Sequence, residues 1–575
     1  MNRVLANLNS ENIAYFSMDV AIDSSIPTYS GGLGILAGDT LRSAADLGVP
    51  LVGVTLLYRK GYFDQHLDSE GNQLETPSKW HPEDHLEPLS SQVTISIEGR
   101  AVQVRGWRYV FRGITGHAVP LLFMDTNIEG NDPRDRALTD HLYGGDEHYR
   151  LCQEVVLGFG GMAMLRALGY NNQRLFHMNE GHSAFVTLAL LTEQAHARPD
   201  HGFSETQIEA VRRQCVFTTH TPVPAGHDRF GAGLIHQVLG EGLASALAQM
   251  GVMDDQLNMT ELALRLSGFV NGVSMQHGEV SRGMFPNYKI QAITNGVHAV
   301  TWTSAPFAAL YDHSLPEWRR DNCYLRYAVG IPLAEIRQAH RRAKQELVQQ
   351  VRWLTGSELD EKVFTLGFAR RATAYKRADL LFSDLERLRQ IARQAGPLQV
   401  VYAGKAHPRD QSGKAIIRRI FEAAAALANS MRVVYLENHD MALGRLLCAG
   451  VDVWLNTPLR PQEASGTSGM KAALNGVPSF SVIDGWWVEG HIEGVTGWSI
   501  EAAEENNPMA EASSLYDKLG NIILPLFYNN PDKFTEVMRS AIAFNGSFFN
   551  TQRMLSQYLR NAYARLSVTT SPLLA

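Results

Sequence analysis

The stretch Glu463-Ala464-Ser465-Gly466-Thr467-Ser468-Gly469-Met470-Lys471 lies between two short apolar runs, at residues 451–456 and 478–483. Both runs have the length and composition of buried strands, and the residues from 467 to 475 between them predict a helix. A strand, a helix and a second strand in this order form one unit of a parallel sheet. The loop after residue 456 therefore leaves the carboxyl end of a strand, which is where open α/β sheets bind ligands.

The same alternation of short apolar runs and amphipathic segments extends through the chain and predicts an α/β fold with two doubly wound sheets. In the second half, strands are expected at 363–367, 399–403, 432–436, 451–456 and 478–483, with helices at 378–395, 414–429, 442–447 and 467–475. In the first half, strands are expected at 13–16, 51–56, 120–124, 175–178 and 215–219, with helices at 37–47, 154–168 and 183–192. Residues 93–105 alternate with period two around a Glu-Gly turn, which predicts a hairpin.

The periodicity breaks between residues 300 and 330, and a long polar helix is expected at 334–354. We therefore expect an N-terminal domain at 1–310 and a C-terminal domain at 311–575, whose final helices could pack back on the first domain.

The composition limits the classes of protein to consider. The 575 residues are 45% hydrophobic and 19% charged, with a formal net charge of −7, so a general surface for nucleic acid or anionic membrane is not expected. Four scattered cysteines fit a reducing cytosol. The longest apolar run, 155–165, is about half the length of a membrane span of roughly 20 residues. A soluble, cytoplasmic enzyme is the expectation.

Lys471 is placed to act as a reactive amine. Its apolar neighbours, including Met470 and Leu474, would bury its stem, and burial makes an amine a better nucleophile by lowering its pKa. The preceding loop offers N–H groups and the Thr467 hydroxyl to a phosphate. This suits an aldehyde cofactor that carries a phosphate, although a capped core helix with a solvated lysine explains these nine residues equally well.

Ser30-Gly31-Gly32-Leu33-Gly34 is a second candidate site, followed by a helix expected from Leu36. It matches the dinucleotide fingerprint only formally, because the strand near Phe16 ends well before the glycines. A glycine loop before a helix still presents N–H groups to an anion, and a tight turn is the alternative.

A third candidate is the cationic cluster Arg370-Arg371 with Tyr375-Lys376-Arg377, at the carboxyl end of the strand expected at 363–367. Guanidinium groups bind phosphate through two hydrogen bonds, and lysine adds a mobile charge. A solvated surface run is the alternative, but the position at the ligand-binding edge of a sheet favours an anion site.

Conventional catalytic motifs are missing from the sequence. His177, Glu180 and His182 follow a strand without the spacing of a metal site, so no metal is expected. His220 also lies at a strand end, where a structural histidine is more common than a catalyst. There is no G-x-S-x-G elbow and no G-x-x-x-x-G-K-[ST] loop.

Together with Thr219-His220-Thr221, Thr294-Asn295-Gly296 and Leu436-Glu437-Asn438, these motifs resemble the α-glucan (glycogen, starch, maltodextrin) phosphorylase family. They occur in the family's order from about Ala14 to Gly490. The resemblance implies a GT-B type fold, in which two Rossmann-like domains face each other across a cleft. It also implies a short bacterial form without an N-terminal regulatory segment.

The implied activity is cleavage of the terminal α-1,4 bond of a glucan (glycogen or maltodextrin) by inorganic phosphate, which gives α-glucose 1-phosphate with retention, using pyridoxal phosphate. The residues implied to hold the cofactor are Lys471, as the Schiff base, with Thr467, Ser468, Arg370 and Trp302. Those implied to hold the substrate phosphate are Gly31, Gly32, Leu33, Arg371 and Lys376. Those implied at the sugar are His220, Asn295, Glu463, Ser465 and Gly466. Lys471, Arg371, Lys376, His220 and Glu463 are the implied catalytic set.

The chain departs from the family pattern at three places: Arg370 stands for the usual Lys, Ser468-Gly469 for Gly-Asn, and His439 for Tyr. The first two keep a charge or N–H donors, whereas His439 leaves one cofactor contact open. A sugar-nucleotide glucan synthase of the same fold is the main alternative, and it would not need Lys471. A glucan-binding protein without catalysis is the third. The resemblance also implies a homodimer.

Overall fold

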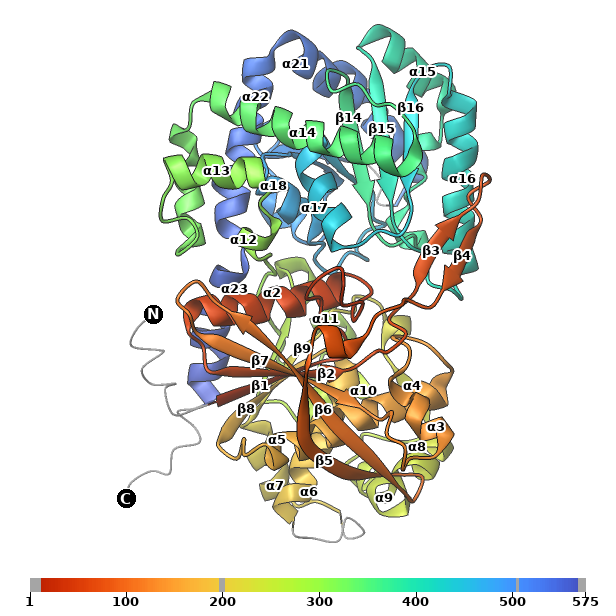
Figure 1. The fold of residues 1–575 in the computed structure, drawn as a ribbon, viewed down its shortest axis with the longest axis vertical. Helices are drawn as coiled ribbons and strands as arrows, with labels where there is room; N and C mark the ends of the chain where they lie inside the picture. The colour runs from red at the N-terminus through yellow and green to blue at the C-terminus, as the bar shows by residue number, and fades with distance from the viewer. Residues whose placement is uncertain (1–11, 196–201, 503–505, 567–575) are drawn as a thin grey trace.

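The short apolar runs pair into two mainly parallel sheets in the computed structural model, which describes residues 12–195, 202–502 and 506–566. The sheets form the centres of two lobes that lie end to end along the long axis of the molecule (Figure 1). The predicted α/β fold of GT-B type, with two doubly wound sheets, is confirmed.

The N-terminal lobe contains a nine-stranded sheet in the order β13-β12-β9-β8-β1-β2-β7-β6-β5. Its strands are β1 (Asn12–Ser17), β2 (Leu51–Leu56), β5 (Glu87–Ile97), β6 (Arg100–Arg112), β7 (Ala118–Asp125), β8 (Gln173–Asn179), β9 (Cys215–Thr218), β12 (Phe269–Gly272) and β13 (Gln291–Ala292). Pairing is parallel except at β5, β6 and β7, so the predicted hairpin lies at one edge. The order reverses between β1 and β8, which creates a switch point beside the glycine loop.

The C-terminal lobe contains a six-stranded, fully parallel sheet in the order β16-β15-β14-β17-β18-β19. Its strands are β14 (Phe364–Ala369), β15 (Leu398–Ala403), β16 (Arg432–Leu436), β17 (Val453–Asn456), β18 (Ser479–Val482) and β19 (Gly497–Ile500). Every residue of β14 and β17 is buried, as expected of strands covered on both faces. The switch point lies between β14 and β17, which lead directly into the cationic cluster and into the loop that carries Glu463.

Helices cover both sheets. In the N-terminal lobe they are α2 (Gly32–Leu47), α3 (Pro133–Arg136), α4 (Glu147–Val155), α5 (Gly161–Ala167), α6 (Phe185–Ala195), α7 (Glu205–Arg212), α8 (Ala232–Leu239), α9 (Glu241–Gln249), α10 (Met259–Arg265) and α11 (Met275–Met284). Helix α12 (Ala299–Trp302) lies between the lobes, and α13 (Ala305–Ser314) and α14 (Leu333–Thr355) lie in the upper lobe (Figure 1). The C-terminal lobe adds α15 (Leu385–Gln394), α16 (Gln411–Leu427), α17 (Met441–Gly450), α18 (Ser468–Ala473), α19 (Trp487–Gly490), α20 (Pro508–Lys518), α21 (Leu524–Asn529) and α22 (Pro531–Ser540).

Three predicted helix starts are wrong, each for a local reason. The helix expected at 154–168 begins at Glu147, because the Asp146 carboxylate accepts the Tyr149 N–H and caps it there. Helix α2 begins at Gly32 and not near residue 36, because the glycine-rich segment itself forms the first turn, in which the Ile35 N–H donates to the Gly31 carbonyl oxygen at 3.2 Å. The helix expected at 378–395 begins only at Leu385, because the Asp384 carboxylate accepts the Arg387 N–H and caps it there.

The last helix, α23 (Thr551–Tyr558), lies beside α2 in the N-terminal lobe (Figure 1). The Ser43 and Thr551 hydroxyls are 2.6 Å apart, and the Tyr558 hydroxyl lies 3.0 Å from that of Thr218. The chain therefore crosses between the lobes twice. The domain boundary at 310 stays a prediction.

Two further antiparallel pairs lie outside the main sheets: β10 (Arg229–Gly231) with β11 (Gln256–Asn258), and β3 (Asp64–Leu67) with β4 (Gln73–Thr76). The β3–β4 hairpin extends from the N-terminal lobe and lies beside α16 of the other lobe (Figure 1). Neither pair was predicted from the sequence.

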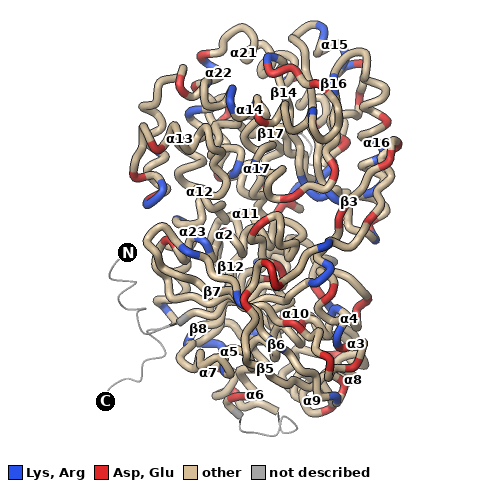
Figure 2. The backbone as a smooth tube through the Cα atoms, viewed as in Figure 1, with Lys and Arg blue, Asp and Glu red and all other residues tan. Residues whose placement is uncertain are grey.

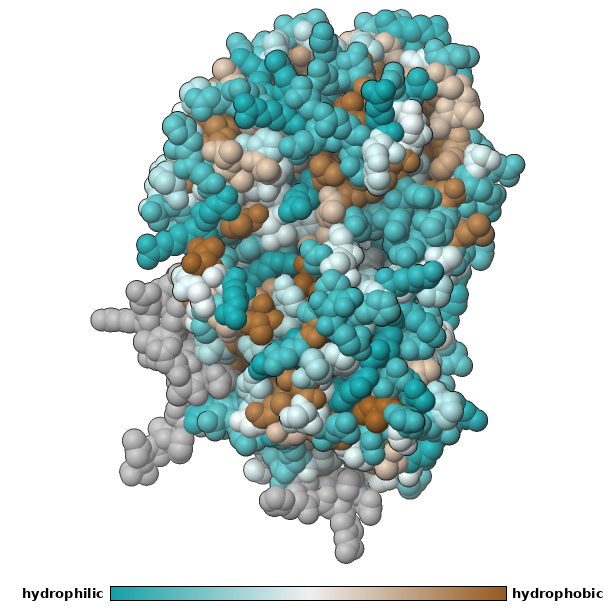
Figure 3. Space-filling view, viewed as in Figure 1, coloured by the Kyte–Doolittle hydropathy of each residue, from teal (hydrophilic) through white to brown (hydrophobic). Residues whose placement is uncertain are grey.

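Charged residues of both signs are spread over the molecule, and Lys and Arg gather where the upper lobe faces the lower one (Figure 2). The visible face is mainly hydrophilic, with apolar residues in small separate spots (Figure 3). Among the described residues, none of the helices combines the length and apolarity that a membrane crossing requires.

Candidate active site

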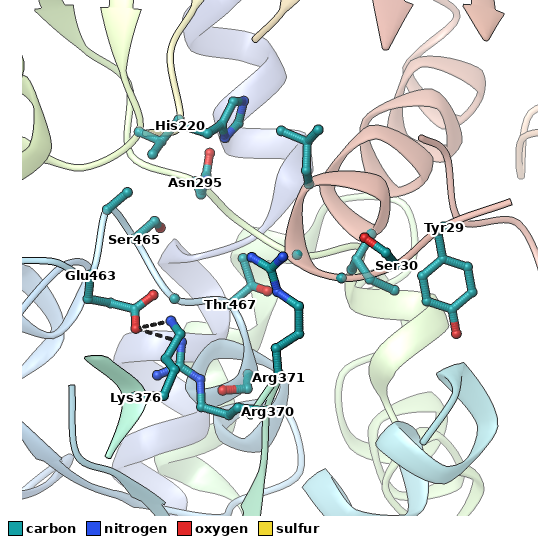
Figure 4. Close-up of a pocket in the computed structure, with 18 of the residues that line it drawn as sticks. Tyr29, Ser30, His220, Asn295, Arg370, Arg371, Lys376, Glu463, Ser465 and Thr467 are labelled. Carbon is teal, nitrogen blue, oxygen red and sulfur yellow. Dashed lines mark hydrogen bonds and ion pairs between the residues drawn. The ribbon is translucent and has the colours of Figure 1, made fainter. Parts of the chain in front are cut away.

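A cavity of about 430 Å³ opens between the lobes and is lined from both of them (Figure 4). The segments at the carboxyl ends of β8 and β9 line it from one side, and those at β14, β15 and β17 line it from the other. It thus lies at the switch points of both sheets. Every site residue predicted from the sequence lines this one cavity: Gly31, Gly32, Leu33, His220, Asn295, Trp302, Arg370, Arg371, Lys376, Glu463, Ser465, Gly466, Thr467, Ser468 and Lys471.

Glu463 is the centre of a buried charge cluster. Its Oε2 atom lies 2.7 Å from the Arg370 guanidinium and also accepts a hydrogen bond from Lys376 Nζ (Figure 4). Burial alone would raise the pKa of this carboxyl, but the two cations outweigh burial and hold the pKa at about 2. Glu463 is therefore ionised at neutral pH, and its Oε1 atom accepts no hydrogen bond from the described residues.

A second buried carboxyl supports the loop of Glu463. Asp484 accepts the Glu463 N–H at 2.9 Å and the Gly485 N–H at 2.9 Å. Burial raises its pKa to about 7, and the charge of Glu463 adds to the shift. The backbone around Glu463 is thus fixed by groups behind the cavity.

Arg371 differs from its neighbour Arg370, because its guanidinium forms no hydrogen bond or ion pair with the described residues. It extends across the cavity toward the loop of Ser30 (Figure 4). A Cβ added to Gly31 would lie 3.1 Å from Arg371 Nε, so only a residue without a side chain at position 31 allows Arg371 to adopt this position without a close contact. This guanidinium is free to bind an anion.

Lys471, on α18, presents its amine to the face of Trp302, with Nζ 3.6 Å from the ring centroid. Burial lowers the pKa of Lys471. Three lysines line the cavity: Lys376 binds Glu463, Lys405 donates to the Phe63 carbonyl oxygen, and Lys471 Nζ has no hydrogen bond or ion pair among the described residues. Lys471 is the lysine free to react.

Trp302 is held from behind by the glycine-loop helix. Its Nε1–H donates to Asp39 Oδ2 at 2.7 Å, and the same oxygen accepts the His298 N–H at 3.0 Å. Asp39 is fully buried on α2. The indole that faces Lys471 is therefore oriented by the N-terminal lobe.

His220 follows β9, and its Nε2 lies 2.7 Å from Asn179 Oδ1. Because Asn179 Nδ2 donates to Ser17, its Oδ1 must accept, which places the proton on His220 Nε2. Burial, with smaller effects of neighbouring histidines, lowers the pKa of His220 well below its usual value. The ring is neutral, and its backbone N–H donates to the Glu180 carboxylate at 2.7 Å.

Unpaired buried atoms gather at this end of the cavity. Asn295 Oδ1, Ser465 Oγ and His182 Nε2 are buried and have no hydrogen-bond partner among the described residues. Buried polar atoms are rarely left unpaired without a reason, and each of these three lines the cavity. They are suited to the hydroxyls of a ligand such as a sugar.

Several lining residues were not predicted as site residues, notably Lys405, Tyr143, Arg150, Glu180 and Asp228, whereas His439, whose cofactor contact the sequence left open, also lines the cavity. Lys405 and His439 follow β15 and β16, so the strand-end rule alone could have found them. Burial lowers the pKa of Lys405 to about 8 and that of His439 to about 4, the latter with the help of Lys471. Among the described residues, no group of three or more His, Cys, Asp or Glu side chains is placed to hold a metal ion.

Residues 20–137 and 227–496 match the sequence profile of the family described as carbohydrate phosphorylase. The chain belongs to this family. The matched segments contain the glycine loop, the cationic cluster and Lys471, whereas His220 lies between them.

Similar proteins in the family cover nearly all of the chain. The maltodextrin phosphorylase of Thermococcus litoralis is 38% identical over 96% of this chain and 71% of its own length. The glycogen phosphorylase of Mycobacterium tuberculosis is 38% identical over 98% of this chain and 72% of its own. That of Aquifex aeolicus is 35% identical over 96% of this chain and 86% of its own.

Proposed function

We propose that this family member is an α-glucan phosphorylase that uses pyridoxal phosphate. It transfers the terminal glucosyl unit of an α-1,4-glucan, such as glycogen or maltodextrin, to inorganic phosphate and releases α-glucose 1-phosphate with retained configuration. Family membership and the names of the similar proteins support the reaction. A homodimer and a cytoplasmic location belong to the proposal and rest on the family resemblance alone.

The observation that carries the proposal is the unpaired amine of Lys471 under the Trp302 ring. A glucan synthase that uses a sugar nucleotide has no need for such an amine. The residues around it fit the cofactor: Lys471 would take the aldehyde, and Thr467, the Ser468 N–H and Arg370 would take the phosphate. Trp302 would form a wall against the ring. When bound, the cofactor supplies a phosphate group that exchanges a proton with the substrate phosphate.

The substrate phosphate would bind to Arg371, Lys376 and the N–H groups of residues 31–33. Two phosphates in one cavity repel each other strongly, because the interaction is weakly screened away from water. Arg370, Arg371 and Lys376 offset that repulsion, and Arg371 is the one with a free guanidinium. The glycine loop brings its backbone close because it has no side chain at Gly31.

The glucosyl unit would occupy the end of the cavity with the unpaired atoms. The unpaired Asn295 Oδ1 and Ser465 Oγ would exchange hydrogen bonds with its hydroxyls, and Glu463, whose Oε2 binds the two cations, would accept one through Oε1, beside Gly466 and His220. Cleavage develops positive charge on the sugar ring. The ionised Glu463 and the backbone carbonyl of His220 would stabilise that charge. The proton for the leaving oxygen would come from the substrate phosphate, so the protein need not supply a separate carboxylic acid.

The proposal is tested by purifying the protein and assaying phosphorolysis of maltodextrin, with Lys471→Ala as the variant. Wild-type protein should absorb in the Schiff-base band of pyridoxal phosphate and release glucose 1-phosphate, and the variant should do neither while remaining folded. Glucosyl transfer from a nucleotide sugar by a cofactor-free protein would overturn the proposal in favour of a synthase.

A further inference from the structure

The β3–β4 hairpin is an arm of the N-terminal lobe whose contacts lie in the other lobe. Its two strands pair only with each other, and it lies beside α16 (Figure 1). A two-stranded hairpin is marginally stable alone in water, so the surface it lies against must hold it. Its outer contacts include the Lys414–Glu75 ion pair at 2.6 Å and the Leu67 N–H donating to Glu437 at 2.9 Å.

Two glutamine side chains of the hairpin bind the backbone of the C-terminal lobe. Gln65, fully buried, donates to the Gly404 carbonyl oxygen at 2.9 Å and accepts the Asn438 N–H at 2.9 Å. Gln73 donates to the Ala406 carbonyl oxygen at 2.8 Å and accepts the Ala406 N–H at 2.9 Å. The two side chains are joined by a hydrogen bond of 2.8 Å from Gln65 Nε2 to Gln73 Oε1. In both side chains the amide nitrogen donates a hydrogen bond and the amide oxygen accepts one, which fixes the position of each side chain.

The segments that the glutamines bind carry two residues of the cavity wall. Lys405 lies between Gly404 and Ala406, and His439 follows Asn438. Lys405 is also held by its side chain, since Nζ donates to the carbonyl oxygen of Phe63, the residue before β3, at 2.8 Å. The hairpin therefore contacts both wall segments without reaching the cavity itself.

These segments also adjoin the cationic cluster. The Arg370 N–H donates to the Ala403 carbonyl oxygen at 3.1 Å, and the Ala372 N–H donates to that of Lys405 at 3.0 Å. Gly404 has φ +148°, and a Cβ there would lie 1.9 Å from the Arg370 carbonyl oxygen. A shift of the 404–406 segment would consequently move the backbone of Arg370.

We propose that Gln65 and Gln73 are positioning residues of the cofactor pocket, which act through Lys405 and His439. This inference rests on the proposed function, since it assigns the wall segments to a pyridoxal phosphate site. Loss of either glutamine should loosen the wall and weaken cofactor binding, although neither side chain touches the cavity. If the hairpin merely joined the lobes, loss of either glutamine would lower the thermal stability of the protein and leave its affinity for the cofactor unchanged.

The experiment uses the full chain with Gln65→Met and Gln73→Met, which keep the side-chain length and remove the amide. Leu74→Ala is the matched control, because Leu74 lies between Gln73 and Glu75 on β4 and is 61% exposed. Three quantities are measured for each protein: the dissociation constant of pyridoxal phosphate from titration of the apoprotein, amide hydrogen exchange in peptides spanning 403–407 and 436–440, and the thermal unfolding midpoint.

We expect both glutamine variants to bind pyridoxal phosphate about tenfold more weakly, because each loses two hydrogen bonds to the backbone of the cavity wall. Protection should fall at Asn438 in Gln65→Met and at Ala406 in Gln73→Met, and Leu74→Ala should match wild type in both. Wild-type cofactor affinity in the glutamine variants would overturn the inference, even if their midpoints fall. If wild-type protein does not bind the cofactor, the proposed function is overturned instead. If amide exchange at 403–407 and 436–440 is also the same in the glutamine variants as in wild type, the contacts of the hairpin with these segments are overturned as well.

Discussion

Replacing Glu463 with Gln should destabilise the protein and make its stability respond to phosphate. The substitution keeps the shape of the side chain and removes the charge that pairs with Arg370 and Lys376. All three side chains are at most 9% exposed, so water cannot replace the lost partner. Two buried cations would be left facing an uncharged amide.

The pKa of Glu463 gives the size of the effect. A pKa of about 2 against an ordinary 4.5 corresponds to about 3 kcal/mol of stability at neutral pH. Because the pKa is depressed in the folded state, this contribution is present above pH of about 4.5, about half as large near pH 3, and lost below about 2. The same 3 kcal/mol would lower the unfolding midpoint by about 3–5 °C, depending on whether one lobe or the whole chain unfolds together.

The assay is thermal unfolding of wild type and Glu463→Gln in phosphate-free buffer near pH 7, repeated at falling pH and then with added inorganic phosphate. Phosphate should recover part of the loss, since the freed cations can bind it. Glu536→Gln is the control: its exposed pair with Lys533 is worth less than about 1 kcal/mol. A midpoint for Glu463→Gln equal to that of wild type, or a deficit independent of pH, would show that the ionised Glu463 does not stabilise the fold through Arg370 and Lys376.

Three other substitutions separate binding from stability. Gly31→Ala should raise the KM for phosphate about tenfold with stability within about 0.5 kcal/mol, because its Cβ would displace the exposed Arg371 side chain; steady-state kinetics with an unchanged KM would contradict this. Asn295→Ala should cost the free protein little, since Oδ1 is already unpaired, yet lower kcat/KM for glucan at least tenfold; an unfolding midpoint well below wild type with normal kinetics would reverse the assignment. Asp484→Asn should gain stability relative to wild type as the pH rises from about 4 to about 7. The pKa of Asp484 is raised in the folded state, so wild type loses stability as this carboxyl ionises between its unfolded and folded pKa values, whereas Asn does not ionise. Denaturant unfolding at several pH values measures the difference, and a difference independent of pH would exclude a titrating Asp484.

The sequence predicted most of what depends on short-range pattern. Apolar runs located the parallel strands, and the rule that ligands bind beyond their carboxyl ends brought Arg371, Glu463 and Lys471 to one cavity. Helix α14 was predicted to within one residue at each end, because its inward-facing residues, such as Ile336, Ala343 and Leu347, recur at the three- and four-residue spacing of a helix.

What the sequence did not reveal depends on contacts between distant residues. Asp39 and Trp302 are 263 positions apart, and no local pattern links them. The β3–β4 hairpin has no regular apolar alternation, because its buried residues are glutamines that bind the other lobe. Such polar pairs become visible only once both partners are placed in space.

Trapping the cofactor on its lysine would show directly whether Lys471 forms the Schiff base. The purified protein would be loaded with pyridoxal phosphate, reduced with borohydride, digested and mapped by mass spectrometry. The free amine of Lys471 predicts that the reduced cofactor is found on Lys471, and that Lys376 and Lys405, which are already hydrogen-bonded, stay unmodified. A modification on Lys405, whose pKa is also lowered, or no incorporated cofactor at all, would contradict the account.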